Sequence, residues 1–231
     1  MALVATFFSL SSLFFSCEKE VPLPQGDQFL MVDAQGSTRV DGAQLRCQLE
    51  LMPKQPLETV ELNSLQFMRE EEKLAHDVYN VFYQQYGSRI FYNISASENT
   101  HFAAVGRLLE RYDMPDPSSG KALGMFENET LQALFNELTA KGAVSLSEAL
   151  RVGALIEEID IRDLQHDLLE VVNNDDIAMV YANLMQGSRN HLRAFVRSLD
   201  MLGLTYEPEI LSVSEYSDII NSPMERGNQG Q

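Results

Sequence analysis

The chain has 231 residues, of which 45% are hydrophobic, and it carries a formal net charge of −17. This length is sufficient for one well-packed core with room for a small additional element. The excess of acidic residues argues against nucleic acid as a partner and against electrostatic binding to anionic lipid, because both are polyanions.

The N-terminus has the features of an export signal. Residues 2–16 carry no charged side chain, and Cys17 follows them directly. A run of this length is too short to span a bilayer and is typical of the apolar part of a signal peptide. A small residue, Ser16, directly before a cysteine is typical of bacterial lipoproteins, although no Lys or Arg precedes the run and Phe14 stands where leucine is usual.

We therefore expect residues 1–17 to be a signal peptide with its lipobox. In this interpretation Cys17 is lipidated, and the lipid anchors the protein to a membrane of the bacterial cell envelope, at the outer membrane or the periplasmic face. The alternative is a buried or disordered apolar tail with no targeting role.

Residues 18–56 include two prolines in VPLPQ and show no sustained helical pattern. We expect this segment to be a linker with weak structure, in which the short apolar run at 29–32 could form a strand.

From Leu57 onward, apolar residues recur at steps of three and four, which predicts helices with one buried face. The first long helix is expected at about 58–86, where Gly87 ends it. After a short loop, a second helix is expected to begin with Ser95 or Ser97 as its N-cap.

A shorter helix near 129–141 precedes two more long helices. The third is expected to begin at Ser145 or Ser147, since Ser145 and Glu148 have the spacing of a capping box. The fourth is expected to follow Asn174 and to run to about Leu202.

Two pairs of long helices joined by one long crossover between the second and third helices have the connectivity of ferritin-like proteins. We therefore expect an all-α fold, a ferritin-like four-helix bundle over residues 57–203. The C-terminal tail, residues 204–231, could fold back against the bundle around Tyr206 and Ile210.

Six ionisable residues occupy positions on these helices where a buried apolar residue would be expected. They are Glu72, Glu98, His101, Glu157, Asp160 and His191. Ionisable groups in a core are costly unless something satisfies them, and a pair of metal ions would do so. Four carboxylates and two imidazoles are mostly hard oxygen donors, which suit two iron or manganese ions with positions left open for oxygen or peroxide.

Other polar residues near these six are expected to have supporting roles. We expect His76, one turn after Glu72, to support a ligand rather than to bind metal. Ser188, Arg189 and Arg193 flank His191 and could orient ligands or offset carboxylate charge. Ordinary polar cover of the fourth helix is the alternative for these residues. Glu70 and Glu71 are expected to be solvated.

Four segments taken together resemble the DUF2202 family of ferritin-like proteins, and the resemblance extends over about residues 60–203. The segments are REEEKLAHDVY (69–79), IFYNISASENTHF (90–102), SLSEALRVGALIEEIDIRDL (145–164) and GSRNHLRAF (187–195). The wider superfamily, typified by rubrerythrin and ferritin, is similar to this chain only in its carboxylate and histidine pattern.

Carrying that pattern over implies Glu72 as the ligand of the first helix, Glu98 and His101 as the Glu-x-x-His pair of the second, and Glu157 as the ligand of the third. The fourth helix departs from the pattern, because Ser188 stands where the second Glu-x-x-His has its glutamate. Asp160 is our candidate for the missing carboxylate, and a mononuclear or asymmetric site stays open.

We expect from this ligand set an envelope-anchored di-metal carboxylate protein containing iron or manganese, with oxidase or peroxidase activity on O2 or peroxide as the first hypothesis. A non-catalytic protein that binds or stores metal, and a metal-free helical module for protein interactions, are the alternatives. A homodimer through helix faces is also open.

Overall fold

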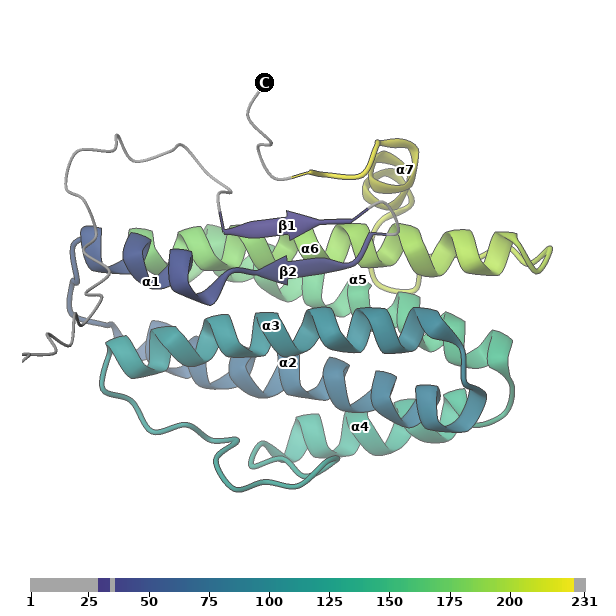
Figure 1. Ribbon diagram of the computed structural model, residues 1–231, viewed down its shortest axis with the longest axis horizontal. Coiled ribbons are helices and arrows are strands. Elements are labelled where there is room, and N and C mark those ends of the chain that lie inside the picture. Colours follow the sequence, from purple (N-terminus) through teal and green to yellow (C-terminus); the bar gives the residue numbers. More distant parts are fainter. Residues whose placement is uncertain (1–28, 34–35, 227–231) are drawn as a thin grey trace, which may run out of the picture.

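The computed structural model describes residues 29–33 and 36–226 (Figure 1). The predictions made for residues 1–17, including lipidation of Cys17, lie outside the described residues.

Four long helices form the body of the molecule, and the expectation of a mostly helical fold is confirmed. They are α2 (Thr59–Tyr86), α3 (Arg89–Arg111), α5 (Leu146–Glu170) and α6 (Asp175–Asp200). Helix α2 packs along α3, and α5 packs along α6. The crossover between the two pairs contains α4 (Glu129–Gly142), which packs on α2 and α5 (Figure 1).

The ends of these helices follow from local chemistry. Helix α2 ends where Gly87 adopts a φ of 62°, a left-handed conformation that glycine takes without steric cost, and the Gly87 N–H donates to the carbonyl of Tyr83. The predicted cap of the third long helix is confirmed, because the Ser145 hydroxyl accepts the Glu148 N–H at 3.1 Å.

The predicted start of the second long helix is wrong. Helix α3 begins at Arg89 with Ser88 as its N-cap, so the turn from α2 is tight and Ser97 lies within the helix. The Ser97 hydroxyl accepts the backbone N–H of Thr38 at 2.9 Å, and it therefore holds a distant segment rather than a helix end.

The segment before α2 contains the strand that the apolar run at 29–32 allowed, but its described part is more ordered than the expected linker. It forms strand β1 (Leu30–Val32), strand β2 (Thr38–Val40) and helix α1 (Gly42–Leu51). The strands pair antiparallel, and β2 packs on α3, so that the hairpin lies over one face of the bundle (Figure 1). Phe29 and Leu45 are fully buried, which shows that the segment contributes to the core. Its elements are short and are stabilised by burial on the bundle, so they leave little periodic signal in the sequence.

The tail folds back around Tyr206, as the sequence analysis allowed. The Tyr206 hydroxyl donates to one oxygen of the buried Glu158 carboxylate, and the backbone N–H groups of Ile210 and Leu211 donate to the other. A short helix, α7 (Val213–Asn221), follows. Among the helices of the described ranges, we find none that has both the length and the apolar character needed to cross a membrane.

The apolar core is divided into two clusters. One is centred on Tyr79, Phe82 and Phe195, and the other on Leu65, Leu108 and Tyr181. Between them, at one level of the four long helices, buried charged side chains replace the apolar ones. This polar layer contains the six residues that the sequence analysis selected.

Candidate metal centre

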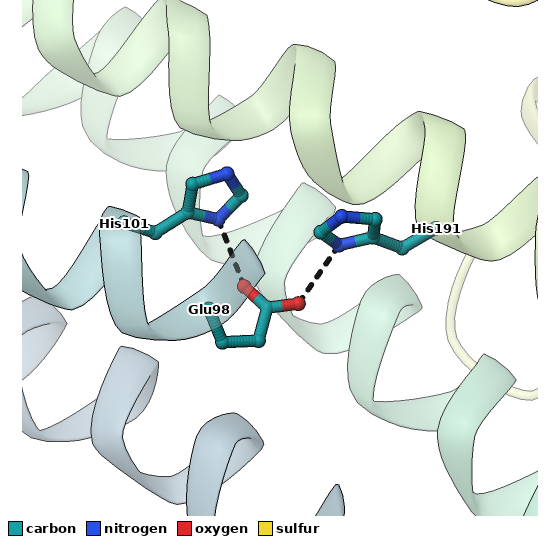
Figure 2. A group of neighbouring side chains, drawn as sticks. All are labelled: Glu98, His101 and His191. Carbon is teal, nitrogen blue, oxygen red and sulfur yellow. Dashed lines mark ion pairs between the residues drawn. The ribbon is translucent and has the colours of Figure 1, made fainter. Parts of the chain in front are cut away.

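Glu98 lies between two histidines at the middle of the polar layer (Figure 2). Its Oε2 atom is 2.8 Å from Nδ1 of His101, and its Oε1 atom is 2.8 Å from Nδ1 of His191. Glu98 and His101 come from α3, one turn apart, whereas His191 comes from α6. All three side chains are fully buried, and their donor atoms lie within 4.8 Å of one another, so this cluster could bind a metal ion.

Each histidine also lies near a second carboxylate. The second carboxylate comes from α2 for His101 and from α5 for His191. Nδ1 of His101 lies 3.5 Å from Oε2 of Glu72, on α2. Nδ1 of His191 lies 3.5 Å from Oε2 of Glu157, on α5. The arrangement is therefore nearly symmetric, with Glu98 shared and one further carboxylate on each side.

The donor atoms of this cluster make ion-pair contacts but few hydrogen bonds. Among the described residues, no hydrogen-bond partner is found for either oxygen of Glu72 or Glu98, for Oε2 of Glu157, or for Nδ1 of either histidine. Buried polar atoms are normally hydrogen-bonded, and unpaired ones call for another explanation. A cation at these atoms satisfies carboxylate oxygens and imidazole nitrogens alike, so the residues present fit a metal site.

Electrostatics in the cluster favour charged rings when no cation is bound. Burial opposes the charge, but Glu98 and the second carboxylate outweigh it and raise the pKa of His101 to about 9 and the pKa of His191 to about 10. Burial raises the pKa of Glu72 and of Glu157 to about 7. Metal ions that bind at the two Nδ1 atoms must therefore displace the protons there.

Thr38, from strand β2, hydrogen-bonds both rings on the side away from Glu98. Its Oγ1 atom is 2.8 Å from Nε2 of His101 and 3.1 Å from Nε2 of His191, and the residue is 3% exposed. A hydroxyl oxygen can accept two hydrogen bonds, so both Nε2–H groups can donate to it while both Nδ1 atoms face the carboxylates. Sequence reasoning missed Thr38, because no local pattern indicates that a strand so far from the helices along the chain would cover the histidines.

Gly187, one turn before His191 on α6, makes room for the other histidine. A Cβ atom at this position would lie 2.5 Å from Cε1 and 2.8 Å from Nε2 of His101. Any residue with a Cβ atom at position 187 would displace the His101 ring, so only glycine fits here. A glycine within a helical pattern, four residues before a candidate ligand, was the available signal for this role.

Tyr79 adds a further contact, since its hydroxyl donates to Oε1 of Glu157 at 2.6 Å. Asp160 is buried in the same layer, and both of its oxygens lack a hydrogen-bond partner among the described residues. Its strongest charged neighbours are carboxylates, with Glu71 first among them.

The expected solvation of Glu70 and Glu71 is wrong, since each is only 2% exposed. The Glu70 carboxylate accepts the backbone N–H groups of Glu127 and Asn128, so it holds the loop before α4. Packing of this crossover on α2 buries the side of the helix that an isolated bundle would leave in water.

The remaining candidates make their contacts at the edges of the centre. His76 bridges α2 and α3, with Nδ1 2.8 Å from the Ser95 carbonyl and Nε2 2.9 Å from the Asn80 amide. The Ser188 hydroxyl donates to the Leu184 carbonyl of its own helix.

The two arginines of α6 bind the C-terminal segment. Nε of Arg189 lies 2.8 Å from the Glu225 carboxylate, and Nη2 of Arg193 lies 2.9 Å from it. Arg193 also donates to the carbonyl of Ile219 and to the hydroxyl of Ser222. These contacts tie the tail to α6.

A family model described as an uncharacterized protein domain, DUF2202, matches residues 61–223. The chain belongs to the DUF2202 family. The match begins after the hairpin and α1, so all six candidate ligands lie within the DUF2202 region and Thr38 precedes it.

One relative is the uncharacterized protein MJ0754 of Methanocaldococcus jannaschii. It is 48% identical over 176 residues, which make up 76% of this chain and 95% of the relative. The crystal structure of a hypothetical protein MJ0754 from Methanococcus jannaschii DSM 2661 superimposes with a TM-score of 0.73 at 48% identity. The superposition covers 75% of this chain and 99% of that chain. These comparisons establish the family and a shared helical fold, whereas an activity has to be argued from the centre itself.

Proposed function

We propose that the protein binds a pair of iron or manganese ions in the polar layer and uses them to react with dioxygen or peroxide, as a ferritin-like di-metal carboxylate protein. The observation that carries this proposal is the position of Glu98, whose two oxygens each approach Nδ1 of a different histidine. A carboxylate whose two oxygens each face the imidazole of a different half-site is the arrangement expected of a ligand that two ions would share.

The surrounding residues divide into two half-sites. Glu72 and His101 would hold one ion, Glu157 and His191 the other, and Glu98 would contact both. Oxygen donors with one nitrogen per ion favour iron or manganese over copper. The single crossover between two helix pairs, which is the connectivity of ferritin-like proteins, supports the same assignment.

Bound iron or manganese would supply the electrons that reduce O2 or peroxide. The protein side chains contribute burial, which excludes bulk water from the reaction, and fixed orientation. The Tyr79 hydroxyl holds one oxygen of Glu157, and Thr38 holds both rings with Nδ1 turned inward. Ser188 stands where the resembled pattern has a fourth-helix glutamate, so α6 would offer His191 alone, and Glu98 would be the carboxylate that both half-sites have in common.

Metal content decides the first part of this proposal. After reconstitution with Fe2+ or Mn2+ and removal of excess metal, we expect about two ions per chain by elemental analysis, the number that the two half-sites would hold. The double variant Glu98→Ala/His101→Ala should retain almost none. Absence of bound metal from the reconstituted protein would refute the proposal.

Turnover decides the second part. The loaded, reduced protein should consume peroxide or O2, whereas the double variant should not. A fully loaded protein without consumption would instead establish the non-catalytic alternative, a protein that binds or stores metal.

Replacing Thr38 by valine should weaken metal binding, because both rings lose the partner that fixes their orientation. Loss of such an outer hydrogen bond typically costs roughly 10- to 100-fold in metal affinity. Competition with a chelator would measure the change. Thr38→Ser, which keeps the hydroxyl, should restore most of the affinity.

A matched control is Thr100→Val. The Thr100 hydroxyl accepts the Val40 N–H and so holds the same hairpin, but it makes its other contact with the Ser97 carbonyl. Equal losses of affinity in Thr38→Val and Thr100→Val would show that the hairpin as a whole, rather than the Thr38 hydroxyl, matters.

A further inference from the structure

A second group of carboxylates lies beside the candidate centre, between α2 and α5. These helices run antiparallel, and two contacts fix their register: the Ser64 hydroxyl with Asp167, and the Tyr79 hydroxyl with the Gly153 carbonyl. Seven residues on from Ser64 is Glu71, and seven residues back from Asp167 is Asp160. Glu71 and Asp160 are therefore opposite one another.

Both carboxylates are buried and unpaired. Glu71 and Asp160 are each 2% exposed, and none of their four oxygens has a hydrogen-bond partner within residues 29–33 and 36–226. Asp163, one turn after Asp160, is the strongest charged neighbour of Glu71. Ionised carboxylates have no hydrogen to donate to each other, so such a group needs a proton or a cation between its members.

The charges around this group do not neutralise it. Glu72 adds to the negative charge near Glu71, and Glu157 adds to that near Asp160. A nearby cation is Arg162, which donates to Oδ1 of Asp163 at 2.7 Å and is half exposed. It offsets part of the charge at the solvent side and leaves the buried oxygens without a partner.

We propose that Glu71, Asp160 and Asp163 form a separate binding site for a hard divalent cation, distinct from the pair of half-sites around Glu98. Its donors are carboxylate oxygens without imidazole, a set that suits Mn2+, Mg2+ or Ca2+. This site goes beyond the proposed function and needs neither histidine. It also changes the role of Asp160. The sequence led us to expect that Asp160 replaces the missing fourth-helix carboxylate, whereas here it binds a separate cation.

The site is open to solvent on one side. Along one face of α5 the exposure of the carboxylates increases, from Glu157, which is fully buried, through Asp160 to Asp163, whose side chain is 25% exposed. An ion held here can exchange through Asp163, whereas the ions around Glu98 are enclosed. The cation of this acidic site is therefore the weaker and faster-exchanging one.

The test is a titration of the full chain with Mn2+, in which free Mn2+ is followed by electron paramagnetic resonance. Wild-type protein should show a tight class of sites and a weaker class of about one ion per chain, the number that three carboxylates can hold. Glu71→Gln should lose the weaker class and keep the tight one. The variant His101→Ala/His191→Ala should do the reverse.

Glu170→Gln is the matched control, because it removes one exposed carboxylate from the end of α5 without touching the group. It should leave both classes unchanged. Thermal melting provides a second measurement: Mn2+ added to the histidine variant should raise its melting temperature, and this increase should disappear when Glu71→Gln is added.

Two results would overturn the proposed site. Retention of the weaker class in Glu71→Gln would mean that a shared proton, rather than a cation, joins these carboxylates. Loss of both classes together would mean that Glu71 belongs to the centre around Glu98. Failure of the proposed function is distinguishable from both, because the tight class would then be missing or would be unaffected by the histidine substitutions.

Discussion

Replacing Glu98 by glutamine is expected to remove nearly all bound metal and to destabilise the metal-free protein. Glutamine has a similar shape, but it brings no negative charge to the two rings that Glu98 contacts at 2.8 Å. Breaking a buried ion pair by removal of one partner typically costs about 3–5 kcal/mol. For a chain of this size such a loss lowers the melting temperature by about 10 °C.

Calorimetry or circular dichroism with and without a chelator would separate the two effects. With chelator, the difference between wild type and variant reports the lost charge of Glu98 alone. Added metal should raise the wild-type melting temperature and leave that of the variant almost unchanged, because a ligand stabilises only the protein that binds it. An unchanged metal content in Glu98→Gln would contradict the central position of this carboxylate.

The control is Glu129→Gln, which removes an exposed carboxylate in the first turn of α4. The metal content of Glu129→Gln should equal that of wild type. Any change in its melting temperature should be small, since exposed charges at a helix N-terminus contribute about 0.3–1 kcal/mol.

Replacing Gly187 by alanine is expected to release the ion on the His101 side, or to weaken its binding strongly, through a single methyl group. The new Cβ would lie 2.5 Å from Cε1 of His101, so the ring must move. Its Nδ1 faces Glu98 and its Nε2 faces Thr38, and both contacts would be lost as it moves. Metal content after removal of excess metal should fall by about half, because the half-site at His191 does not depend on this ring position.

Helix propensity makes this substitution informative. Glycine to alanine within a helix is otherwise favourable by about 1 kcal/mol, so a loss of stability or of metal can only come from the steric contact. Gly42→Ala, at the start of α1, is the matched control, because a Cβ there meets no atom within 4 Å. If Gly187→Ala binds as much metal as wild type, the His101 ring can move without loss of the ion. Such a result would contradict the fixed ring position on which the proposed half-site depends.

The sequence located the polar layer well because helical periodicity is a local property. Each of Glu72, Glu98, Glu157 and His191 occupies a position on an apolar stripe, and steps of three and four residues assign that face without knowledge of the other helices. The structure buries all four of them and brings them together around the two histidine rings.

Periodicity also has a limit, which the run at residues 70–72 shows. Three consecutive glutamates point in three directions from a helix, so only one of them falls on the main stripe. Glu70 and Glu71 are nevertheless buried, one by the loop before α4 and the other by α5. Which outward faces of a helix become covered depends on elements that are distant along the chain.

The amino-acid sequence by itself determined that the protein is mostly helical, the approximate bounds of three of its four long helices, and which charged residues on their apolar stripes enter the interior. These properties follow from the period of the helix and from local capping chemistry. Only the tertiary structure decided that a hairpin before the bundle places Thr38 over both histidines, that Gly187 clears the space for His101, and that Glu71 faces Asp160. Each of these depends on the register between segments far apart in the chain, which packing of the assembled core sets and which no local pattern encodes.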